Sequence, residues 1–365
     1  MQNALTAGAV PRTSQLVELA LRGLESMYDS EKGLFCHRLC KTSDGMVREG
    51  ISQRYTIMTL LGLLRAQSAG LKSPVDVEAT VERLLDDTTW VNNIGDLGLL
   101  LWLCAATSRK NLRRCNAAFD LSGALQRFPD ARRRLTMELS WFLTGLANAS
   151  KAESAVNLEP LANETYRLVQ ASQGQHGLFG HMATRQSLAG VVRGRFGSFA
   201  DQVYPVLAMA HFSKVFGHHG ARENALRCVS AICSLQGSLG QWWWHYDSAT
   251  GRVVEHYPVY SVHQHAMGPM ALLVLQDAFG ADFYVFINNG LNWIYGANEL
   301  GQDLEDTDAG VVWRCIRPSK ASSYAARMRA LMGKEPPQVP LQILYECRPY
   351  ELGWLLYALA QPSQR

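Results

Sequence analysis

The segments Glu138–Ala147, "ELSWFLTGLA", and Glu351–Ala360, "ELGWLLYALA", are the most informative stretches of this 365-residue chain. They are identical at six of ten positions although they lie far apart in the sequence. Each begins with a carboxylate and continues as a run with apolar residues on every side. A helix that is apolar all round is buried in the protein interior. The repeat therefore predicts two equivalent buried helices.

Four further segments have the same form. "YTIMTLLGLL" begins at Tyr55, "DLGLLLWL" at Asp96, "DQVYPVLAMA" at Asp201 and "HAMGPMALLV" at His265. The last two each carry a proline four residues after their start, which suits the first turn of a helix. Together with the first pair, they predict six buried helices.

Amphipathic segments alternate with the buried ones, and strand-like alternation is almost absent. The pattern predicts twelve helices, near residues 13–28, 52–68, 76–88, 94–107, 112–127, 132–149, 158–172, 198–216, 221–235, 262–278, 283–296 and 349–361.

Six buried helices that alternate with six amphipathic ones predict an all-α fold, an (α/α)6 toroid, in which an inner ring of helices stands inside an outer ring. We expect a single domain over residues 1–365, with a long loop excursion at about 299–345 before the last inner helix.

The inner helices of such a toroid run in the same direction, so their first residues converge on one end of the ring. Acidic residues at these positions also favour the helix dipole, and capping alone explains any single one. Four carboxylates and a histidine in one cup exceed what capping requires. The predicted catalytic candidates are Asp96, Glu138, Asp201, Glu351 and His265, with Tyr55 as a substrate-binding candidate.

The connection between Trp242 and His265 is rich in functional side chains and should lie over the mouth of this cup. A buried hydrogen-bonded cluster is the alternative interpretation. Arg54, Arg195 and Arg348 lie near inner-helix starts and could balance the carboxylates. The further substrate-binding candidates are Trp243, Trp244, His245, Tyr246, Asp247, Tyr257, Tyr260, His263 and Arg195.

Two loops share a motif that resembles a known repeat. Gln236–Trp242 reads QxxxGxW, and Gln173–Phe179 has the same form with Phe in the last place. This resembles the QW repeat of squalene and terpenoid cyclases, whose domains are α/α toroids like those of protein prenyltransferase β subunits. The resemblance implies that Trp242 is structural. It also implies an acid-initiated cyclisation of an isoprenoid.

The segment "DLEDTDAGVVW", Asp303–Trp313, resembles the DxDD acid motif of class II terpenoid cyclases. By this resemblance Glu305 or Asp306 would be the catalytic acid. A solvated acidic loop is the alternative, because the β-branched run that follows argues against a helix.

A different resemblance comes from the first loop, "DSEKGLF", Asp29–Phe35. It is similar to loops of six-hairpin glycosidases and unsaturated glucuronyl hydrolases, which place carboxylates at the starts of inner helices. This implies a carbohydrate-active enzyme, a glycoside hydrolase, lyase or uronate epimerase, with paired carboxylates as general acid and base. A non-enzymatic binding scaffold is the third alternative.

Composition excludes several other classes. The chain is 47% hydrophobic and 18% charged, which is typical of a globular protein. A net charge of +3 gives no support for nucleic-acid binding. We expect no signal peptide, no integral membrane segment and a cytoplasmic location, with the eight cysteines as free thiols.

The sequence predicts no cofactor and no metal. "CHRLC", from Cys36 to Cys40, lacks the second pair of ligands that a zinc site needs. No phosphate-binding glycine loop follows a strand. The expected partner is a small-molecule substrate, an isoprenoid or a sugar, and the sequence leaves a homodimer open.

Overall fold

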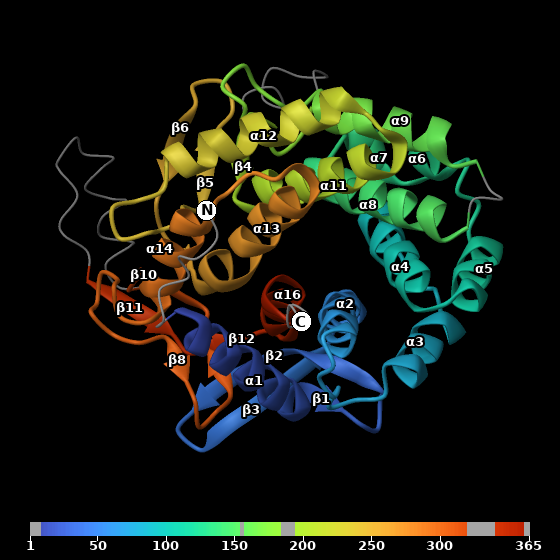
Figure 1. Ribbon diagram of the computed structural model, residues 1–365. Helices are drawn as coiled ribbons and strands as arrows, with labels where there is room; N and C mark the ends of the chain where they lie inside the picture. The colour runs from blue at the N-terminus through green and yellow to red at the C-terminus, as the bar shows by residue number, and fades with distance from the viewer. Residues whose placement is uncertain (1–8, 154–156, 184–193, 320–339, 361–365) are drawn as a thin grey trace.

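The computed structural model describes residues 9–153, 157–183, 194–319 and 340–360. Its helices form two concentric rings (Figure 1). The inner ring consists of α2 (Gln53–Ser68), α4 (Ile94–Thr107), α8 (Thr136–Ala152), α11 (Ala200–Phe216), α13 (Gly268–Phe279) and α16 (Pro349–Leu359). The outer ring consists of α1 (Ala9–Met27), α3 (Val77–Asp86), α5 (Arg109–Ala118), α9 (Glu159–Gln170), α12 (His219–Ser234) and α14 (Tyr284–Ile294).

Each inner helix packs against the next, and α16 closes the ring against α2 and α13. Two neighbours, α2 and α16, meet backbone to backbone. A Cβ atom built on Gly62 would lie 2.0 Å from the carbonyl oxygen of Gly353, so neither helix tolerates a side chain there. The predicted (α/α)6 toroid is confirmed.

The inner helices are hydrophobic throughout, as the sequence predicted. In α4, for example, every residue from Ile94 to Cys104 is buried. The outer helices bury one face only, as in α3, whose buried positions follow a helical spacing. No helix in the described part of the chain is long and apolar enough to span a membrane.

The outer helix predicted near 112–127 is present but ends earlier than expected. The helix α5 ends at Ala118, and two short helices follow, α6 (Ala124–Arg127) and α7 (Pro129–Arg133). Between α5 and α6, Asp120 accepts hydrogen bonds from the backbone and hydroxyl of Ser122, which stabilises a turn in place of a helix.

The expected near-absence of strands is also wrong. A long hairpin, β2 (Leu34–Thr42) with β3 (Gly45–Ile51), follows the short β1 (Tyr28–Asp29). The remaining strands are short: β4 (Phe196–Ser198), β5 (His245–Asp247), β6 (Arg252–Glu255), β7 (Val259–Tyr260), β8 (Glu305–Asp306), β9 (Val311–Val312), β10 (Cys315–Pro318), β11 (Leu341–Leu344) and β12 (Glu346–Cys347).

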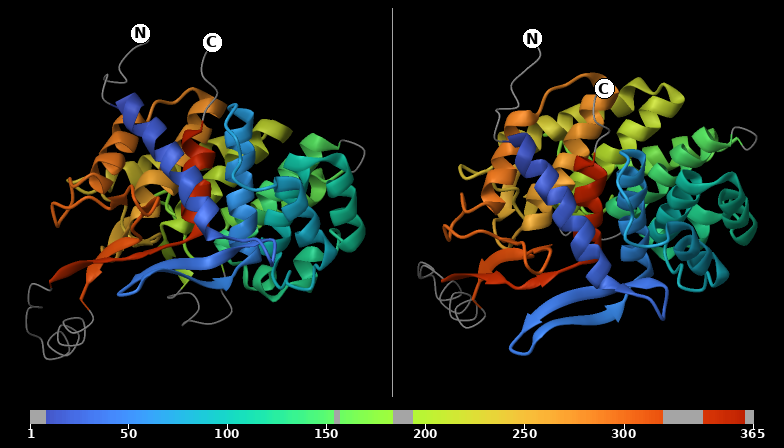
Figure 2. Two further views of the ribbon diagram at one scale, coloured as in Figure 1. Left: turned by 90° about the horizontal axis from the view of Figure 1, so that it is seen from below. Right: turned by 60° about the horizontal axis from the view of Figure 1, so that its bottom comes forward.

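The sheets lie at the end of the toroid where the inner helices begin, opposite the C-terminal end of α16 (Figure 2). The predicted excursion at 299–345 includes residues 320–339, which lie outside the described residues. Its described parts form β8 to β11, and β10 pairs with β7 and β11. The excursion is therefore partly sheet, and it returns to the ring.

The loops that carry the glutamine motif share their hydrogen bonds. The side-chain amide of Gln173 donates to the carbonyls of Gly177 and Asn224, and that of Gln236 donates to the carbonyls of Gly240 and Phe286. Each glutamine therefore ties its loop to the next outer helix.

The aromatic residue of each motif is fixed to the following inner helix or to the helical turn directly before it. The backbone N–H of Phe179 donates to Gln202, and that of Trp242 donates to Gln264. The Trp242 side chain is fully buried and stacks on Phe199 at a centroid distance of 5.5 Å. These contacts give Trp242 a packing position in the wall of the toroid.

Buried aromatic rings fill the ring at mid-height. Trp102 and Trp354 stack at 5.8 Å, and the indole nitrogen of Trp354 donates to the hydroxyl of Tyr204. Tyr204 faces a cavity at the N-terminal end of the inner helices, whereas Trp102 contacts His211, which lines a cavity at the other end. The toroid thus has two separate cups.

Candidate functional site

The cup at the N-terminal end contains a cavity of about 290 Å³, here called the arginine cavity. Three arginines and six aromatic side chains contribute to its wall. The arginines are Arg54, Arg314 and Arg348, and the aromatic residues are Tyr55, Trp141, Tyr204, Trp244, Tyr260 and Tyr350.

A second cavity of about 510 Å³, here called the histidine cavity, lies next to it and shares Met137 in its wall. Its polar lining consists of His181, Ser198, Asp201, His245 and Glu255. The two cavities together occupy the place where the sequence predicted a cup.

Asp96 and Glu351 both lie at this end, each bound to an arginine of the cavity wall. Arg54 Nε donates to Asp96 Oδ1 over 2.7 Å, and Arg314 pairs with Glu351. Glu351 also accepts a hydrogen bond from the backbone of Arg348 over 3.1 Å, as an N-terminal cap of α16. Burial raises the pKa of Glu351 although Arg314 acts in the opposite direction. Both carboxylates therefore hold arginines in position.

Glu346, which the sequence did not single out, completes this charge network. It lies 2.7 Å from Arg348 Nε and 3.6 Å from Arg314 Nε. Burial would raise the pKa of Glu346, but the hydrogen bond from Arg348 and the charge of Arg314 lower it. Arg348 also donates to the hydroxyl of Tyr55 over 2.8 Å. The arginines are thus fixed in place and keep further N–H groups for a ligand.

Glu138 differs from Asp96 and Glu351 because it has no arginine partner in the described part of the chain. It lines neither cavity itself, but its neighbour Met137 lines both. Its Oε2 atom is buried and makes no hydrogen bond there. Burial, assisted by the charge of Asp201, raises the pKa of Glu138 to about 7. A carboxyl with such a pKa exists in both protonation states near neutral pH, as a general acid or base requires.

Asp201 lines the histidine cavity and is tied to the strand that precedes its helix. Its Oδ2 atom accepts hydrogen bonds from the backbone and the hydroxyl of Ser198, both over 2.9 Å, and lies 3.3 Å from His181 Nδ1. Its Oδ1 atom is buried without a partner among the described residues. Asp201 is therefore held rigidly with one oxygen uncommitted.

His265 does not line either of these cavities, whereas His263 lines the arginine cavity. Both belong to a π-helical turn, η1 (His263–Met267), before α13. Residues two apart point to roughly opposite sides of a helical turn, so only one of the pair faces the cup. Burial lowers the pKa of both rings to about 3. At neutral pH they are therefore uncharged.

The predicted binding residues divide into two groups. Five of them line a cavity. Tyr55, Trp244, Tyr260 and His263 line the arginine cavity, where the rings of Trp244 and Tyr260 are 4.6 Å apart, and His245 lines the histidine cavity, bound to Glu255 over 2.8 Å. The other five stand outside both linings, and these are Trp243, Tyr246, Asp247, Tyr257 and Arg195.

Those five stabilise the loops around the cup. Arg195 pairs with Asp247, linking two loops, and the backbone N–H of Trp243 donates to the hydroxyl of Tyr246. Trp243 also donates to the carbonyl of Leu235, and Tyr257 donates to Glu299. Most of their hydrogen-bonding groups are therefore used within the fold, although Arg195 Nε is buried without a partner among the described residues.

The predicted acids of the cyclase interpretation, Glu305 and Asp306, lie in β8 and line neither cavity. Asp306 caps a turn at Ala309 and lies 3.8 Å from Lys41. The segment forms a two-stranded ribbon with β9 instead of opening a helix, because Val311 and Val312 favour a strand.

Several lining residues had no signal in the sequence. Arg314 lies in the turn before β10, inside the excursion. His181 and Ser198 lie in the segment before α11, where Ser198 is the last residue of β4. Trp141 did have one, since it occupies the shared tryptophan position of the "ELSW" and "ELGW" repeat. Within the described residues, no group of three or more His, Cys, Asp or Glu side chains is arranged to hold a metal ion.

No family pattern and no curated protein sequence matches the chain. Solved structures do match its fold. A possible member of the GH105 family from Klebsiella pneumoniae is 14% identical, with a TM-score of 0.62. The match covers 99% of this chain and 94% of the Klebsiella chain.

An unsaturated glucuronyl hydrolase from Bacillus sp. GL1, responsible for glycosaminoglycan degradation, has the same identity of 14% and the same TM-score of 0.62. That match covers 97% of this chain and 100% of the hydrolase. A sugar epimerase from a ruminal bacterium is 8% identical, with a TM-score of 0.64. The match covers 96% of this chain and 98% of the epimerase. These likenesses show the fold. They support the glycosidase-type toroid, and the terpenoid-cyclase resemblance gains no support from them.

Proposed function

We propose that the chain is a carbohydrate-active enzyme that hydrolyses an acidic sugar substrate in the cup formed by the arginine and histidine cavities. The observation that carries the proposal is Glu138, whose buried carboxyl has an unpartnered oxygen and a pKa raised to about 7. Glycoside hydrolysis uses one carboxyl as acid and a second carboxylate as base or nucleophile.

Glu138 takes the role of the acid in this proposal and donates its proton to the leaving oxygen. Asp201 takes the role of the second carboxylate, because Ser198 holds one of its oxygens and leaves the other free. The two carboxyls are close enough for the charge of Asp201 to raise the pKa of Glu138. Such a pair, with different environments, is typical of general acid and base catalysis.

The lining of the arginine cavity supports an acidic sugar. Guanidinium groups bind carboxylates through paired hydrogen bonds, and aromatic rings such as Trp244 and Tyr260 offer flat surfaces to a sugar ring. A uronate would place its carboxylate against Arg348 or Arg54. The unsaturated glucuronyl hydrolases among the structural neighbours act on sugars of this class, in keeping with the proposal.

The same lining argues against the isoprenoid reaction. A cyclase stabilises a travelling carbocation with aromatic faces in an apolar pocket, whereas this lining is strongly polar and includes the guanidinium groups of Arg54, Arg314 and Arg348. A non-enzymatic scaffold, in turn, would not need a carboxyl kept half protonated at neutral pH.

Epimerisation of a sugar is the second candidate, and His263 favours it. Its neutral ring lines the arginine cavity, and its Nδ1 atom has no partner among the described residues. A pKa of about 3 makes it a weak base, however, which is why Glu138 is preferred.

The proposal is tested by incubating the purified protein with unsaturated glucuronyl disaccharides and with neutral disaccharides of the same linkage. Chromatography should show cleavage of the acidic set only. Arg348→Gln should raise KM for the acidic substrate by about tenfold or more. Cleavage of the neutral set alone, or exchange of a carbon-bound proton in deuterated water without cleavage, would replace the proposal with a neutral glycosidase or with an epimerase.

A further inference from the structure

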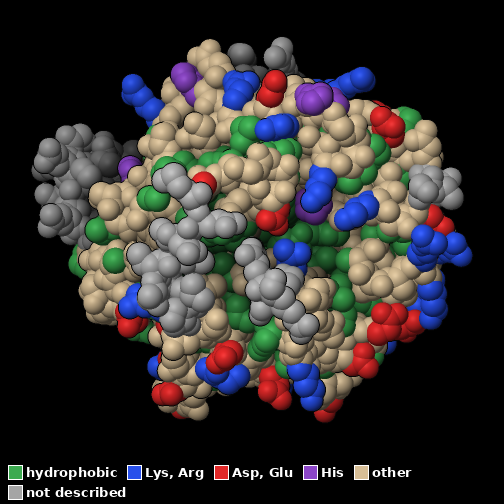
Figure 3. Space-filling view, viewed as in Figure 1, with side chains coloured by type: hydrophobic (Ala, Val, Ile, Leu, Met, Phe, Trp, Pro, Cys, Tyr) green, Lys and Arg blue, Asp and Glu red, His purple; other side chains and the backbone are tan. Residues whose placement is uncertain are grey.

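The second cup, at the C-terminal end of the inner helices, contains a cavity of about 720 Å³ on the opposite side of the aromatic layer from the candidate active site. Figure 3 shows this face of the molecule, with hydrophobic side chains inside the central hollow and Lys and Arg side chains around it. The volume is in the range of small-molecule binding sites.

Charged groups around this cavity are predominantly basic. Arg65 on α2, Lys151 on α8 and Lys214 on α11 line it, and among the described residues Asp277 on α13 is its one acidic lining residue. None of these four forms an ion pair with another described residue, whereas the arginines of the other cup are all paired with carboxylates. Cations near helix C-termini are favoured by the helix dipole, which explains the two lysines individually.

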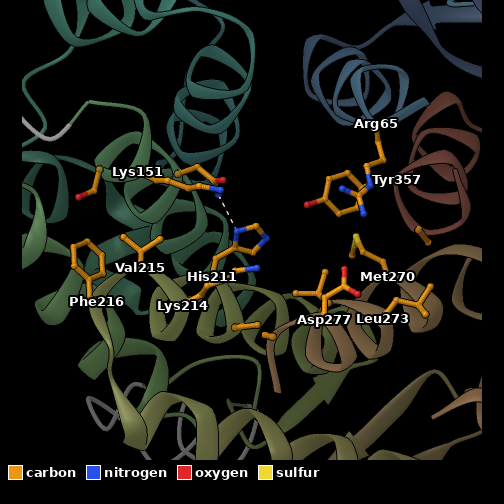
Figure 4. Close-up of a pocket in the computed structure, with 16 residues that line it drawn as sticks. Arg65, Lys151, His211, Lys214, Val215, Phe216, Met270, Leu273, Asp277 and Tyr357 are labelled. Atoms are coloured by element: carbon orange, nitrogen blue, oxygen red, sulfur yellow. Dashed lines mark hydrogen bonds between the residues drawn. The ribbon is translucent and has the colours of Figure 1, made fainter. Parts of the chain in front are cut away.

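His211 provides an observation that the helix dipole does not explain. Its ring points from α11 into the space between the helices, towards Tyr357 and Arg65 on the opposite wall (Figure 4). The amide nitrogen of Asn148 lies 3.2 Å from His211 Nδ1 and also donates to the carbonyl of Thr144 over 2.8 Å. The second contact fixes the orientation of the amide, because its oxygen would face a carbonyl if it were reversed.

An amide nitrogen only donates, so Nδ1 of His211 accepts, and the proton of the neutral ring resides on Nε2. Burial and the charges of Lys151 and Lys214 lower the pKa of His211 to about 4, in keeping with a neutral ring. Its Nε2 atom is buried and has no partner among the described residues. A buried N–H donor without an acceptor destabilises the fold, and a ligand oxygen would remove that cost.

Apart from Asn148 and Ser150, the remainder of the wall is mainly apolar. Met270, Leu273 and Val274 on α13 face Val215 and Phe216 at the end of α11, and Tyr357 closes the floor next to Trp102. A ligand that fits this cavity therefore has an anionic end and a hydrophobic body.

We propose that the cup at the C-terminal end of the inner helices is a second binding site, for a small organic oxyanion, in which Lys151, Lys214 and Arg65 hold the anionic group, His211 donates a hydrogen bond from Nε2, and the α13 side chains hold an apolar or aromatic body. The site is independent of the proposed function, since the layer of Trp102, Trp354 and Tyr204 separates the two cups.

Titration calorimetry with benzenesulfonate tests the site, because this probe keeps its charge at all relevant pH values. Benzenesulfonamide, neutral and of almost the same shape, is the matched ligand. The wild-type protein should bind the sulfonate at least about tenfold more tightly. The double variant Lys151→Ala/Lys214→Ala should lose that preference, and Lys32→Ala/Lys72→Ala, with the same change of charge at exposed lysines outside this cavity, should keep it.

Two further variants locate the bound probe. His211→Phe removes the N–H group but keeps a ring against Trp102, and should weaken sulfonate binding several-fold at an unchanged melting temperature. Arg348→Gln, in the other cup, should leave it unchanged. The proposal would be overturned if the protein bound the two probes with equal affinity. It would also be overturned if sulfonate binding survived in the lysine double variant and disappeared in Arg348→Gln.

Discussion

The indole nitrogen of Trp354 donates a hydrogen bond to the hydroxyl of Tyr204 over 2.9 Å, and this contact joins α16 to α11 across the centre of the toroid. Both side chains are almost completely buried. The pair belongs to the aromatic layer that separates the two cups, so each cup can have its own chemistry. Because the pair joins α16 to α11, substitutions at these two residues test how strongly the two inner helices are held together.

We predict an energetic coupling between these two residues. Trp354→Phe and Tyr204→Phe each remove one partner and leave the other buried and unsatisfied, which costs about 1–3 kcal/mol. The double variant should be less destabilised than the sum of the single variants, by about 1 kcal/mol. Urea unfolding of the four proteins measures this coupling. Strict additivity would show that the hydrogen bond contributes nothing to stability.

Trp242 should be important for stability and not for chemistry. It is fully buried, stacks on Phe199 and lines neither cavity of the candidate site. Trp242→Ala should therefore cost about 3–5 kcal/mol of unfolding free energy. Trp244→Ala, at the half-buried neighbour that lines the arginine cavity, is the control and should cost less while it impairs turnover more. The reverse pattern in thermal melts and assays would assign Trp242 to the substrate.

His265 should make the protein sensitive to acid. Burial lowers the pKa of His265 to about 3, and both ring nitrogens are buried without partners among the described residues. The unfolded chain takes up a proton near pH 6.5 and the folded chain does not, so stability falls as the pH decreases from about 6.5 towards 3. His265→Leu should reduce the slope of melting temperature against pH in that range. A slope equal to that of wild type would contradict the assignment.

Glu138 should affect stability with the opposite sign. Because its pKa is raised to about 7 in the folded state, the unfolded chain releases the proton first, and stability is lost as the pH rises from about 4.5 through 7. Glu138→Gln should remove this loss and melt at a higher temperature than wild type at pH 8. Asp96→Asn, which breaks the ion pair with Arg54, should melt lower instead. A destabilised Glu138→Gln at pH 8 would mean that the carboxylate has a stabilising partner.

The sequence was sufficient to predict the inner ring. A segment such as Ile94–Thr107 is apolar on every side, and burial is the one environment that accepts it. The first residue of each segment also indicated the end of the toroid at which the cup lies, because parallel helices bring their first residues to one end. The helix predicted near 112–127 was too long at its C-terminal end, because the turn at Asp120 depends on a local side-chain hydrogen bond, which periodicity does not reveal.

The details of the cup could not be predicted from the sequence. Arg314 lies far from Glu351 in the chain and reaches it because β10 pairs with β7 and β11 and brings the excursion back to α16. The contact with Arg314 also gives Glu351 an environment that Glu138 does not have, although the two residues occupy the same position in their sequence repeats. Glu351 is paired with Arg314, whereas Glu138 forms no ion pair with a described residue and keeps a raised pKa.

The pH dependence of turnover in Glu138→Gln tests the central claim most directly. Glu223→Gln, at an exposed glutamate of α12, is the matched control. On an unsaturated glucuronyl disaccharide, the wild-type and control rates should fall as the pH rises above about 7, where Glu138 loses its proton. Glu138→Gln should be slower by about 10²–10⁴-fold, with its fold intact by circular dichroism. Turnover of Glu138→Gln at the wild-type rate, with the same pH profile, would contradict the account.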